Sequence, residues 1–159
     1  MSGGRADRTR IVSLSDTRIR ITRECEAPRH LLFEAWTTPE HIRGWLRDRG
    51  EATIAELRVG GKWRYVRTTA DGREVVAHGE YHEVVPNERI VSVQSHEGAL
   101  EAATVNTVTF TEKDGRTLLT ILVEYANREQ RDQHLESTRA GMPEALARLE
   151  QYAAALKET

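Results

Sequence analysis

The stretch HGEYHE, residues 78–83, holds three side chains that could carry metal or acid–base chemistry, namely His78, Glu80 and His82. They alternate along the chain, and alternate side chains of a strand share one face. Successive side chains on that face are roughly 7 Å apart, so His78 and His82 are too far apart to hold one ion together. A neighbouring pair supplies two ligands, whereas zinc sites use three or four, and His96 is the one further candidate. We therefore predict no metal site.

The stretch LRVGGKWRYV, residues 57–66, contributes an aromatic pair. Trp63 and Tyr65 share one face of a strand, while Lys62 and Arg64 share the other, which we expect to face solvent. The two glycines before them mark a turn into the strand, where the backbone needs conformational freedom. Trp and Tyr combine a large apolar surface with one polar group, as the walls of small-molecule sites do. The pair therefore predicts either a filled core or a pocket wall.

The turn at Asp71–Gly72 decides which residues face this aromatic pair. Asp-Gly is the strongest short-range hairpin signal, and a two-residue turn predicts facing pairs across the two strands. These pairs are Tyr65 with His78 and Trp63 with Glu80. A turn one residue longer would bring Tyr81 opposite Trp63 instead. A two-residue turn at Asn87–Glu88 would extend the same face, pairing His82 with Val93 and Glu80 with Ser95.

His78 and Glu80 have the chemistry for acid–base catalysis if they line a dry pocket beside the aromatic pair. Burial raises the pKa of a carboxylic acid, and a nearby carboxylate favours charged histidine. The alternative is structural, with Glu80 paired to an arginine and His78 hydrogen-bonded within the sheet. Cys25, the only cysteine, lacks a Cys-His-Asn pattern, so we expect a small buried side chain rather than a nucleophile.

The elements that must position these residues follow from spacing. Residues 18–27, RIRITRECEA, alternate isoleucine with polar side chains and predict a strand. Pro28 and the stretch RHLLFEAW predict a short helix, and TTPEHIRGWL a second one. Residues 51–126 predict strands and turns. A two-residue turn at Asp114–Gly115 places an apolar set on one face, with Phe110 opposite Leu119, Val108 opposite Ile121 and Asn106 opposite Val123.

A long helix is predicted to end the chain. Asn127 can cap it, and Gln130 has the reciprocal position of a capping box. Gly141 and Pro143 should interrupt or kink the helix, so we expect its well-packed part to begin near Met142. Its apolar stripe consists of Met142, Leu146, Leu149, Ala153 and Leu156. A helix with one apolar stripe must pack against another element, here the sheet.

Composition bounds the class of protein. The 159 residues fit one domain, with a mobile tail at residues 1–15 and a single domain at residues 16–159. A net charge of −2 lacks the basic excess of a nucleic-acid binder, and we expect the arginines of TRIRITR to form a solvated face. No stretch has the length of a membrane span, and one cysteine makes no internal disulfide. We therefore expect a cytoplasmic protein without membrane or nucleic-acid partners.

Five stretches together resemble the helix-grip fold of the START and birch-pollen-allergen superfamily, SRPBCC. They are ITRECEAPRHLLFEAWTTPEHIRGWL, LRVGGKWRYV, GEYHEVVPNERIV, VTFTEKDGRTLLTI and GMPEALARLEQYAAAL. Within that superfamily the chain is similar to the family named for the C-terminal domain of the activator of Hsp90 ATPase. The resemblance implies an α+β fold, with a curved antiparallel β-sheet wrapped around the long C-terminal helix. It also implies a cavity between them and two short helices, after the first strand, closing one end.

The resulting expectation is a domain that binds a hydrophobic or amphipathic small molecule, without a cofactor and without established catalysis. The expected ligand-binding residues are Trp36, Trp45, Trp63, Tyr65, His78, Glu80, Val93, Met142 and Leu146. Two alternatives remain open. One is a chaperone-associated interaction module, as the family name suggests, and the other is a cyclase-like or hydrolytic enzyme that uses His78 and Glu80. An exposed edge of an antiparallel sheet would also allow a homodimer.

Overall fold

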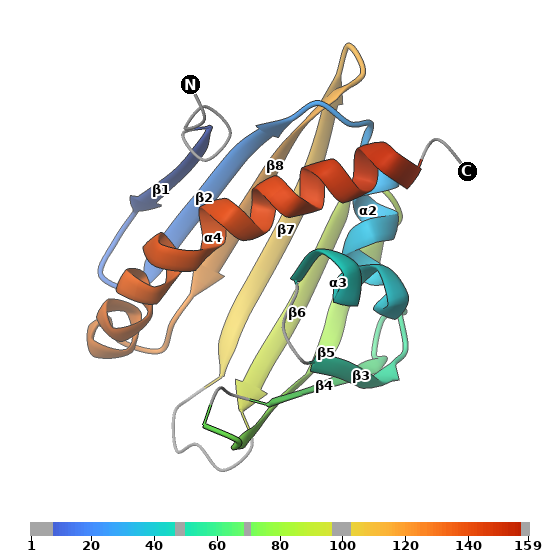
Figure 1. The fold of residues 1–159 in the computed structure, drawn as a ribbon. Helices are drawn as coiled ribbons and strands as arrows, with labels where there is room; N and C mark the ends of the chain where they lie inside the picture. Colours follow the sequence, from blue (N-terminus) through green and yellow to red (C-terminus); the bar gives the residue numbers. More distant parts are fainter. Residues whose placement is uncertain (1–7, 47–49, 69–70, 97–102, 157–159) are drawn as a thin grey trace.

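The computed structural model describes residues 8–46, 50–68, 71–96 and 103–156. Within these residues, eight antiparallel strands form one sheet in the order β1-β2-β8-β7-β6-β5-β4-β3 (Figure 1). The strands are β1 (Thr9–Ser13), β2 (Arg18–Cys25), β3 (Gly50–Ala55), β4 (Lys62–Thr68), β5 (Glu74–Val85), β6 (Arg89–His96), β7 (Thr104–Lys113) and β8 (Arg116–Glu124). The helices are α2 (Arg29–Thr37), α3 (Pro39–Leu46) and α4 (Arg128–Leu156). The predicted α+β fold, with a long C-terminal helix packed on an antiparallel sheet, is confirmed.

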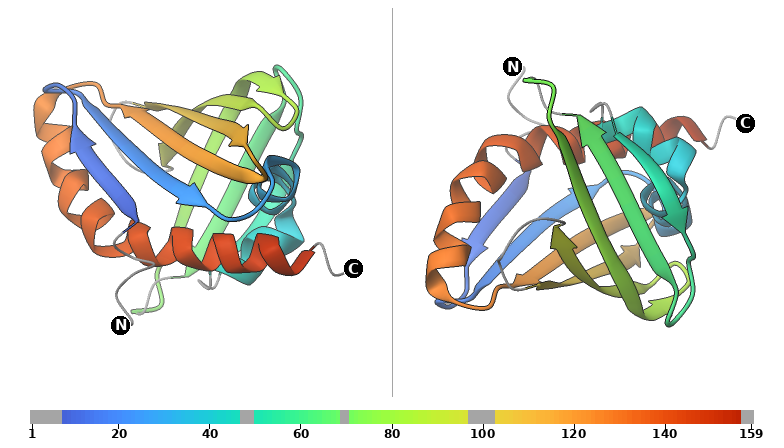
Figure 2. Two further views of the ribbon diagram at one scale, coloured as in Figure 1. Left: turned by 90° about the horizontal axis from the view of Figure 1, so that it is seen from above. Right: turned by 90° about the horizontal axis from the view of Figure 1, so that it is seen from below.

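The sheet curves around α4, and the two short helices close one end of the molecule (Figure 2). Asn127 Oδ1 accepts a hydrogen bond from the Gln130 backbone N–H at 2.8 Å, and Gln130 Oε1 accepts one from the Ala126 N–H at 3.1 Å. These two bonds confirm the predicted cap of α4. The helix is continuous through Pro143, where the sequence predicts a kink, and it changes direction along its length (Figure 2). No helix of the described residues is long and apolar enough to cross a membrane.

Strand β1 corrects the expectation that residues 1–15 form a mobile tail. Thr9–Ser13 pair with β2, and Ile11 lies opposite Ile21 and packs against the core. The polar composition around TRIVS concealed a short strand that has an apolar residue at its centre. Residues 1–7 of the expected tail lie outside the described residues.

The β7–β8 hairpin has the predicted register. Phe110 pairs with Leu119, Val108 with Ile121 and Asn106 with Val123. Asp114 and Gly115 have φ angles of 55° and 78°, as a two-residue turn with two positive φ angles requires. The inward set includes Val108, Phe110, Leu119 and Ile121, all buried.

The β4–β5 register differs from the prediction by one residue. Trp63 pairs with Gly79 and Arg64 with His78, while Lys62 pairs with Glu80. The last pair, Thr68 with Glu74, encloses an odd number of residues, whereas a two-residue turn encloses an even number. A shift of one residue turns every side chain of a strand to the opposite face. His78 and Glu80 therefore lie on the outer face with Lys62 and Arg64, and not beside Trp63.

The β5–β6 register also differs from the prediction. Val85 pairs with Arg89, which leaves a three-residue connection with Asn87 at a φ of 66°. A β-bulge between Tyr81 and Glu83 shifts the register again, so Glu80 pairs with Val93 rather than with Ser95. The outer face consequently includes Val93, and the predicted pair of His82 with Val93 does not form.

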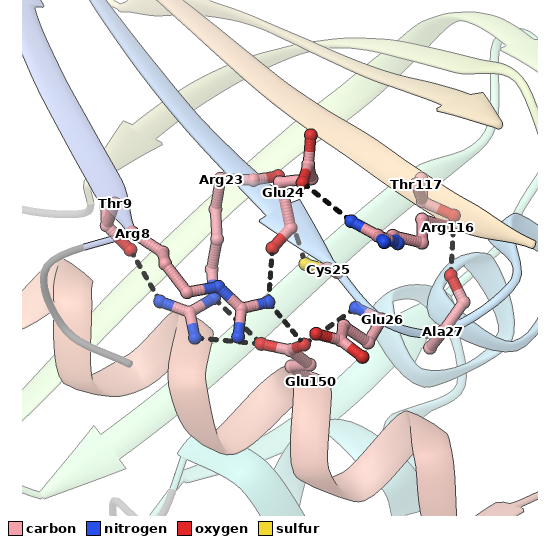
Figure 3. A network of polar contacts seen from close by, with 10 residues as sticks. All are labelled: Arg8, Thr9, Arg23, Glu24, Cys25, Glu26, Ala27, Arg116, Thr117 and Glu150. Atoms are coloured by element: carbon pink, nitrogen blue, oxygen red, sulfur yellow. Dashed lines mark hydrogen bonds and ion pairs between the residues drawn. The ribbon is translucent and has the colours of Figure 1, made fainter. Parts of the chain in front are cut away.

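A buried ion pair joins α4 to β2 (Figure 3). Arg23 is fully buried, and its Nε and Nη2 atoms lie 3.1 and 2.8 Å from Oε1 of Glu150. The other carboxylate oxygen accepts bonds from the Glu26 backbone N–H at 2.7 Å and from Arg8 Nη2 at 2.9 Å. Arg23 Nη1 donates to Thr9 Oγ1 at 2.9 Å. The expectation of a solvated arginine face is therefore wrong for Arg23, whose position on β2 points inward with Ile19 and Ile21.

Candidate functional site

A cavity of about 730 Å³ lies between the sheet and the three helices. Inward side chains of β2, β4, β5, β6, β7 and β8 contribute to its lining, as do side chains of α2, α3 and α4. Ser137 and Gly141 of α4 line the cavity and are also exposed, so the cavity reaches the surface along this helix. Its size falls within the range of roughly 300–1,000 Å³ typical of small-molecule pockets.

An aromatic wall closes the end of the cavity next to the short helices. Trp36 of α2 stacks on Trp45 of α3, with ring centroids 5.6 Å apart and an interplanar angle of 29°. The Trp45 indole N–H donates to the backbone carbonyl of Ala35 at 2.9 Å. Trp36 and Phe110 of β7 pack edge-on, with ring centroids 6.5 Å apart. A ring fixed on both sides loses little side-chain entropy when a ligand binds to it. This wall is therefore preorganised.

Trp63 lies against the backbone of β5 at Gly79. A Cβ atom added at Gly79 would lie 2.7 Å from both Cε2 and Cζ2 of Trp63, and 1.8 Å from the carbonyl oxygen of Val93. Only glycine, which has no Cβ atom, leaves room for the indole to pack against the strand at this position. Tyr65 and Tyr81 line the cavity beside it, and burial raises the pKa of Tyr81. The phenol of Tyr81 is thus neutral at physiological pH.

Polar side chains line the part of the cavity far from the short helices. On the sheet, Ser92 of β6 pairs with Asn106 of β7, and Gln94 pairs with Thr104. On α4, the polar lining comprises Gln130, His134, Ser137 and Thr138. Tyr125 packs on His134, with ring centroids 5.3 Å apart. Burial raises the pKa of the Tyr125 phenol, and a hydrogen bond with Thr138 partly offsets this rise. Among the described residues, no Asp, Glu, Lys or Arg lines this cavity.

Comparison with protein families matches residues 26–154 to the family described as activator of Hsp90 ATPase homolog 1-like protein. The chain belongs to this family. The predicted resemblance is confirmed, and the family match covers α2 through most of α4. No curated protein matches the chain.

Solved structures support the same fold. A Rhodobacter sphaeroides protein is 30% identical, with a TM-score of 0.82, over 93% of this chain and 99% of that one. CalU16 from Micromonospora echinospora is 20% identical, with a TM-score of 0.63, over 91% and 83% of the two chains. DynU16, from the dynemicin biosynthetic locus, is 23% identical, with a TM-score of 0.69, over 87% of this chain and 47% of that one. At these identities, CalU16 and DynU16 show the fold alone.

In this family member, five of the nine residues expected to bind a ligand line the cavity: Trp36, Trp45, Trp63, Tyr65 and Met142. Leu146 of α4 is fully buried in the core. His78, Glu80 and Val93 are placed on the outer face by the two register shifts. The structure thus brings the predicted aromatic residues together and separates them from the predicted ionisable pair.

The inward polar residues were missed from the sequence, although one signal for them was available. The Asp114–Gly115 turn already placed Asn106 opposite Val123, on the apolar face of the hairpin. Alternation along β6 then selects Ser92 and Gln94 with Ile90. Tyr81 could have been found only with the correct β4–β5 register.

Two further predictions concern Cys25 and metal binding. Burial is the main cause that raises the pKa of the Cys25 thiol to about 12, and the nearby Glu150 carboxylate adds to it. This side chain is fully buried, which fits the predicted structural role. Within the described residues, no three His, Cys, Asp or Glu side chains are grouped to hold a metal ion. The side chain of His96 lies outside the described residues.

Proposed function

We propose that this domain binds a largely apolar small molecule in the cavity between its sheet and α4. The observation that carries the proposal is the cavity of about 730 Å³ walled by Trp36, Trp45, Trp63 and Tyr65. A void of this size costs stability unless something compensates for the missing contacts. A cavity that is connected to the surface and lined by oriented aromatic rings is instead typical of a binding site.

Two features favour binding over the predicted acid–base chemistry. His78 and Glu80 lie on the outer face, so the catalytic pair suggested by the sequence does not reach the cavity. The lining from the described residues contains no carboxylate, and its only histidine is His134. A polyketide-type cyclisation or a hydrolysis that uses His78 and Glu80 is therefore not proposed.

The test uses the protein's own fluorescence. All three tryptophans line the cavity, so a bound ligand should change the intrinsic emission directly. We would screen neutral ring-containing metabolites by thermal shift and then titrate each hit while following tryptophan fluorescence. A ligand that binds only the folded protein at 100 times its Kd should stabilise it by about 2.7 kcal/mol.

Two variants locate the binding. Trp63→Ala removes one wall and should weaken binding at least about tenfold, because buried aromatic anchors dominate such sites. His78→Ala is the matched control, since His78 lies next to Gly79 on the same strand but faces outward. The proposal fails if no compound shifts the melting temperature, or if Trp63→Ala binds every hit as tightly as the unchanged protein.

The family description motivates one further arm of the same experiment. If no compound binds while the domain stimulates the ATPase activity of a purified Hsp90 protein, the function as a chaperone-associated interaction module would be supported instead of small-molecule binding. Stimulation that persists in Trp63→Ala would assign the activity to the outer surface. Size-exclusion chromatography with light scattering tests whether the domain forms the homodimer that a sheet edge would allow.

A further inference from the structure

We propose that the ligand is a neutral amphipathic molecule whose ring system lies against the short helices and whose hydroxyl or carbonyl groups lie against β6, β7 and the first half of α4. This inference rests on the proposed function and names its ligand class and orientation. It comes from a gradient of polarity that runs in the same direction along β6 and β7 of the sheet and along α4.

On the sheet, the gradient lies along β6 and β7, in three successive cross-strand pairs, while the neighbouring lining residues Tyr81 of β5 and Val123 of β8 are aromatic and apolar. Ile90 pairs with Val108, Ser92 with Asn106, and Gln94 with Thr104, all with inward side chains that line the cavity. Successive pairs on one face are roughly 7 Å apart, so the change from two apolar residues to four polar ones spans about 14 Å. Asn106 Nδ2 donates to Thr104 Oγ1 at 3.2 Å, which orients the amide within this polar group.

The helix side shows the same change. Gln130, His134 and Thr138 line the cavity from the first half of α4, and Met142 and Ala145 line it from the second half. The second half of α4 lies beside α2, as Figure 1 shows, and Trp36 of α2 contacts Phe110 of β7. Phe110 is the next inward residue after Val108. The apolar ends of both layers therefore coincide, and so do the polar ends.

On β6 and β7, burial follows polarity. Ile90 and Val108 are buried, whereas Ser92, Gln94 and Asn106 are half-buried. The exposed Ser137 also lines the cavity on the polar side. On these two strands, the apolar lining residues are therefore enclosed and the polar ones more accessible. A ligand that enters with its rings first would satisfy both ends.

The polar end favours uncharged groups. It offers amide, hydroxyl and imidazole groups, and no described lysine, arginine or carboxylate lines it. Asn and Gln both donate and accept hydrogen bonds, so they can pair with a hydroxyl or a carbonyl. An ionised carboxylate or ammonium group would lose hydration here without gaining an opposite charge. Charge on the ligand should therefore weaken binding.

The test uses four fluorescent probes that share one ring system: pyrene, 1-pyrenecarboxamide, 1-pyrenecarboxylate and 1-pyrenemethylammonium. Their Kd values would be measured by fluorescence titration at pH 7.5. We expect the carboxamide to bind at least about tenfold tighter than either charged probe. The double variant Gln94→Met and Asn106→Leu replaces both amides by apolar groups of similar size. It should reduce the preference for carboxamide over pyrene by about tenfold, at one hydrogen bond per amide.

Thr107→Val is the control, because Thr107 is the neighbour of Asn106 on the outer face of β7 and should change none of the four Kd values. Unchanged pyrene binding in the double variant would show that its cavity is intact. The inference is overturned if a charged probe binds as tightly as the carboxamide, or if the double variant keeps the full carboxamide preference. If no probe binds, and no screened metabolite binds either, the proposed function falls together with this inference.

Discussion

The Arg23–Glu150 pair gives the most direct prediction of stability. Glu150→Gln keeps the size of the side chain but removes its charge, which leaves the fully buried Arg23 guanidinium without a counter-charge on α4. Breaking a buried ion pair by removing one partner typically costs about 3–5 kcal/mol. For a domain of this length, about 2–4 °C per kcal/mol applies, so the melting temperature should fall by roughly 6–20 °C.

The same variant should change how stability depends on pH. Burial alone raises the pKa of Glu150, but the Glu26 N–H and the hydrogen bond and charge of Arg23 outweigh it and hold the pKa below its usual range. A pKa that is lower in the folded state than in the unfolded state contributes stability above the unfolded value of about 4.3. That contribution is lost as the pH falls through the folded pKa. Glu150→Gln should therefore flatten the acid limb of the stability profile.

Thermal unfolding at pH 7 measures the fall in melting temperature, and urea unfolding from pH 7 to pH 3 measures the pH dependence, both followed by circular dichroism. The control is Glu124→Gln, which breaks the exposed Arg18–Glu124 pair at 3.7 Å and should cost under about 1 kcal/mol. The reasoning is refuted if Glu150→Gln costs no more than this control, or if its acid limb is as steep as that of the unchanged protein.

A second substitution separates a buried unpaired charge from lost packing. Arg23→Met added to Glu150→Gln removes the orphaned charge, while the glutamine can still accept the hydrogen bond from the Glu26 N–H. Removing both charges of a buried pair often restores most of the lost stability. The double variant should therefore be more stable than Glu150→Gln alone. Equal or greater loss would mean that the network acts through its packing and not through its charge.

Two further predictions follow from buried positions. Gly79→Ala should destabilise the fold by at least about 2 kcal/mol in urea unfolding, because the added Cβ would meet the Val93 carbonyl and the Trp63 ring; a loss below about 0.5 kcal/mol would contradict this geometry. Cys25 should resist Ellman's reagent at pH 8 in the folded protein and react in guanidinium chloride, because its pKa of about 12 leaves almost no thiolate; rapid labelling of the native protein would disprove it.

Local sequence signals were sufficient for most of the fold. The cap at Asn127, the turn at Asp114–Gly115 and the register it sets all depend on residues close in the chain, and all are confirmed. The packed stripe of α4 also begins where expected, since its buried apolar residues start at Ala145, soon after Pro143. These features are decided by local geometry and a period of 3.6 residues.

The errors in register arose where a difference of one residue, in a hairpin connection or at a bulge, decides which face of the sheet a side chain points to. The Asp71–Gly72 dipeptide indicated a hairpin, but not how many residues its connection contains, and the bulge beside Tyr81 left no clear mark in the sequence. Because strand side chains alternate with a period of two, one miscounted residue moved His78 and Glu80 out of the candidate site. Arg23 was misjudged for another reason, since its partner Glu150 is distant in the chain and only tertiary packing brings the two together.

The two halves of α4 differ in how they pack on the sheet, which explains how the fold can be stable and still contain a cavity. The second half carries Leu146, Leu149 and Glu150, so apolar packing and the buried ion pair hold it to β2 and the short helices. The first half has a buried cap residue, Gln130, and then polar side chains that line the cavity without filling it. The helix changes direction along its length (Figure 2), and Pro143 lies inside it. Apolar packing and the buried ion pair are therefore concentrated on the second half of α4.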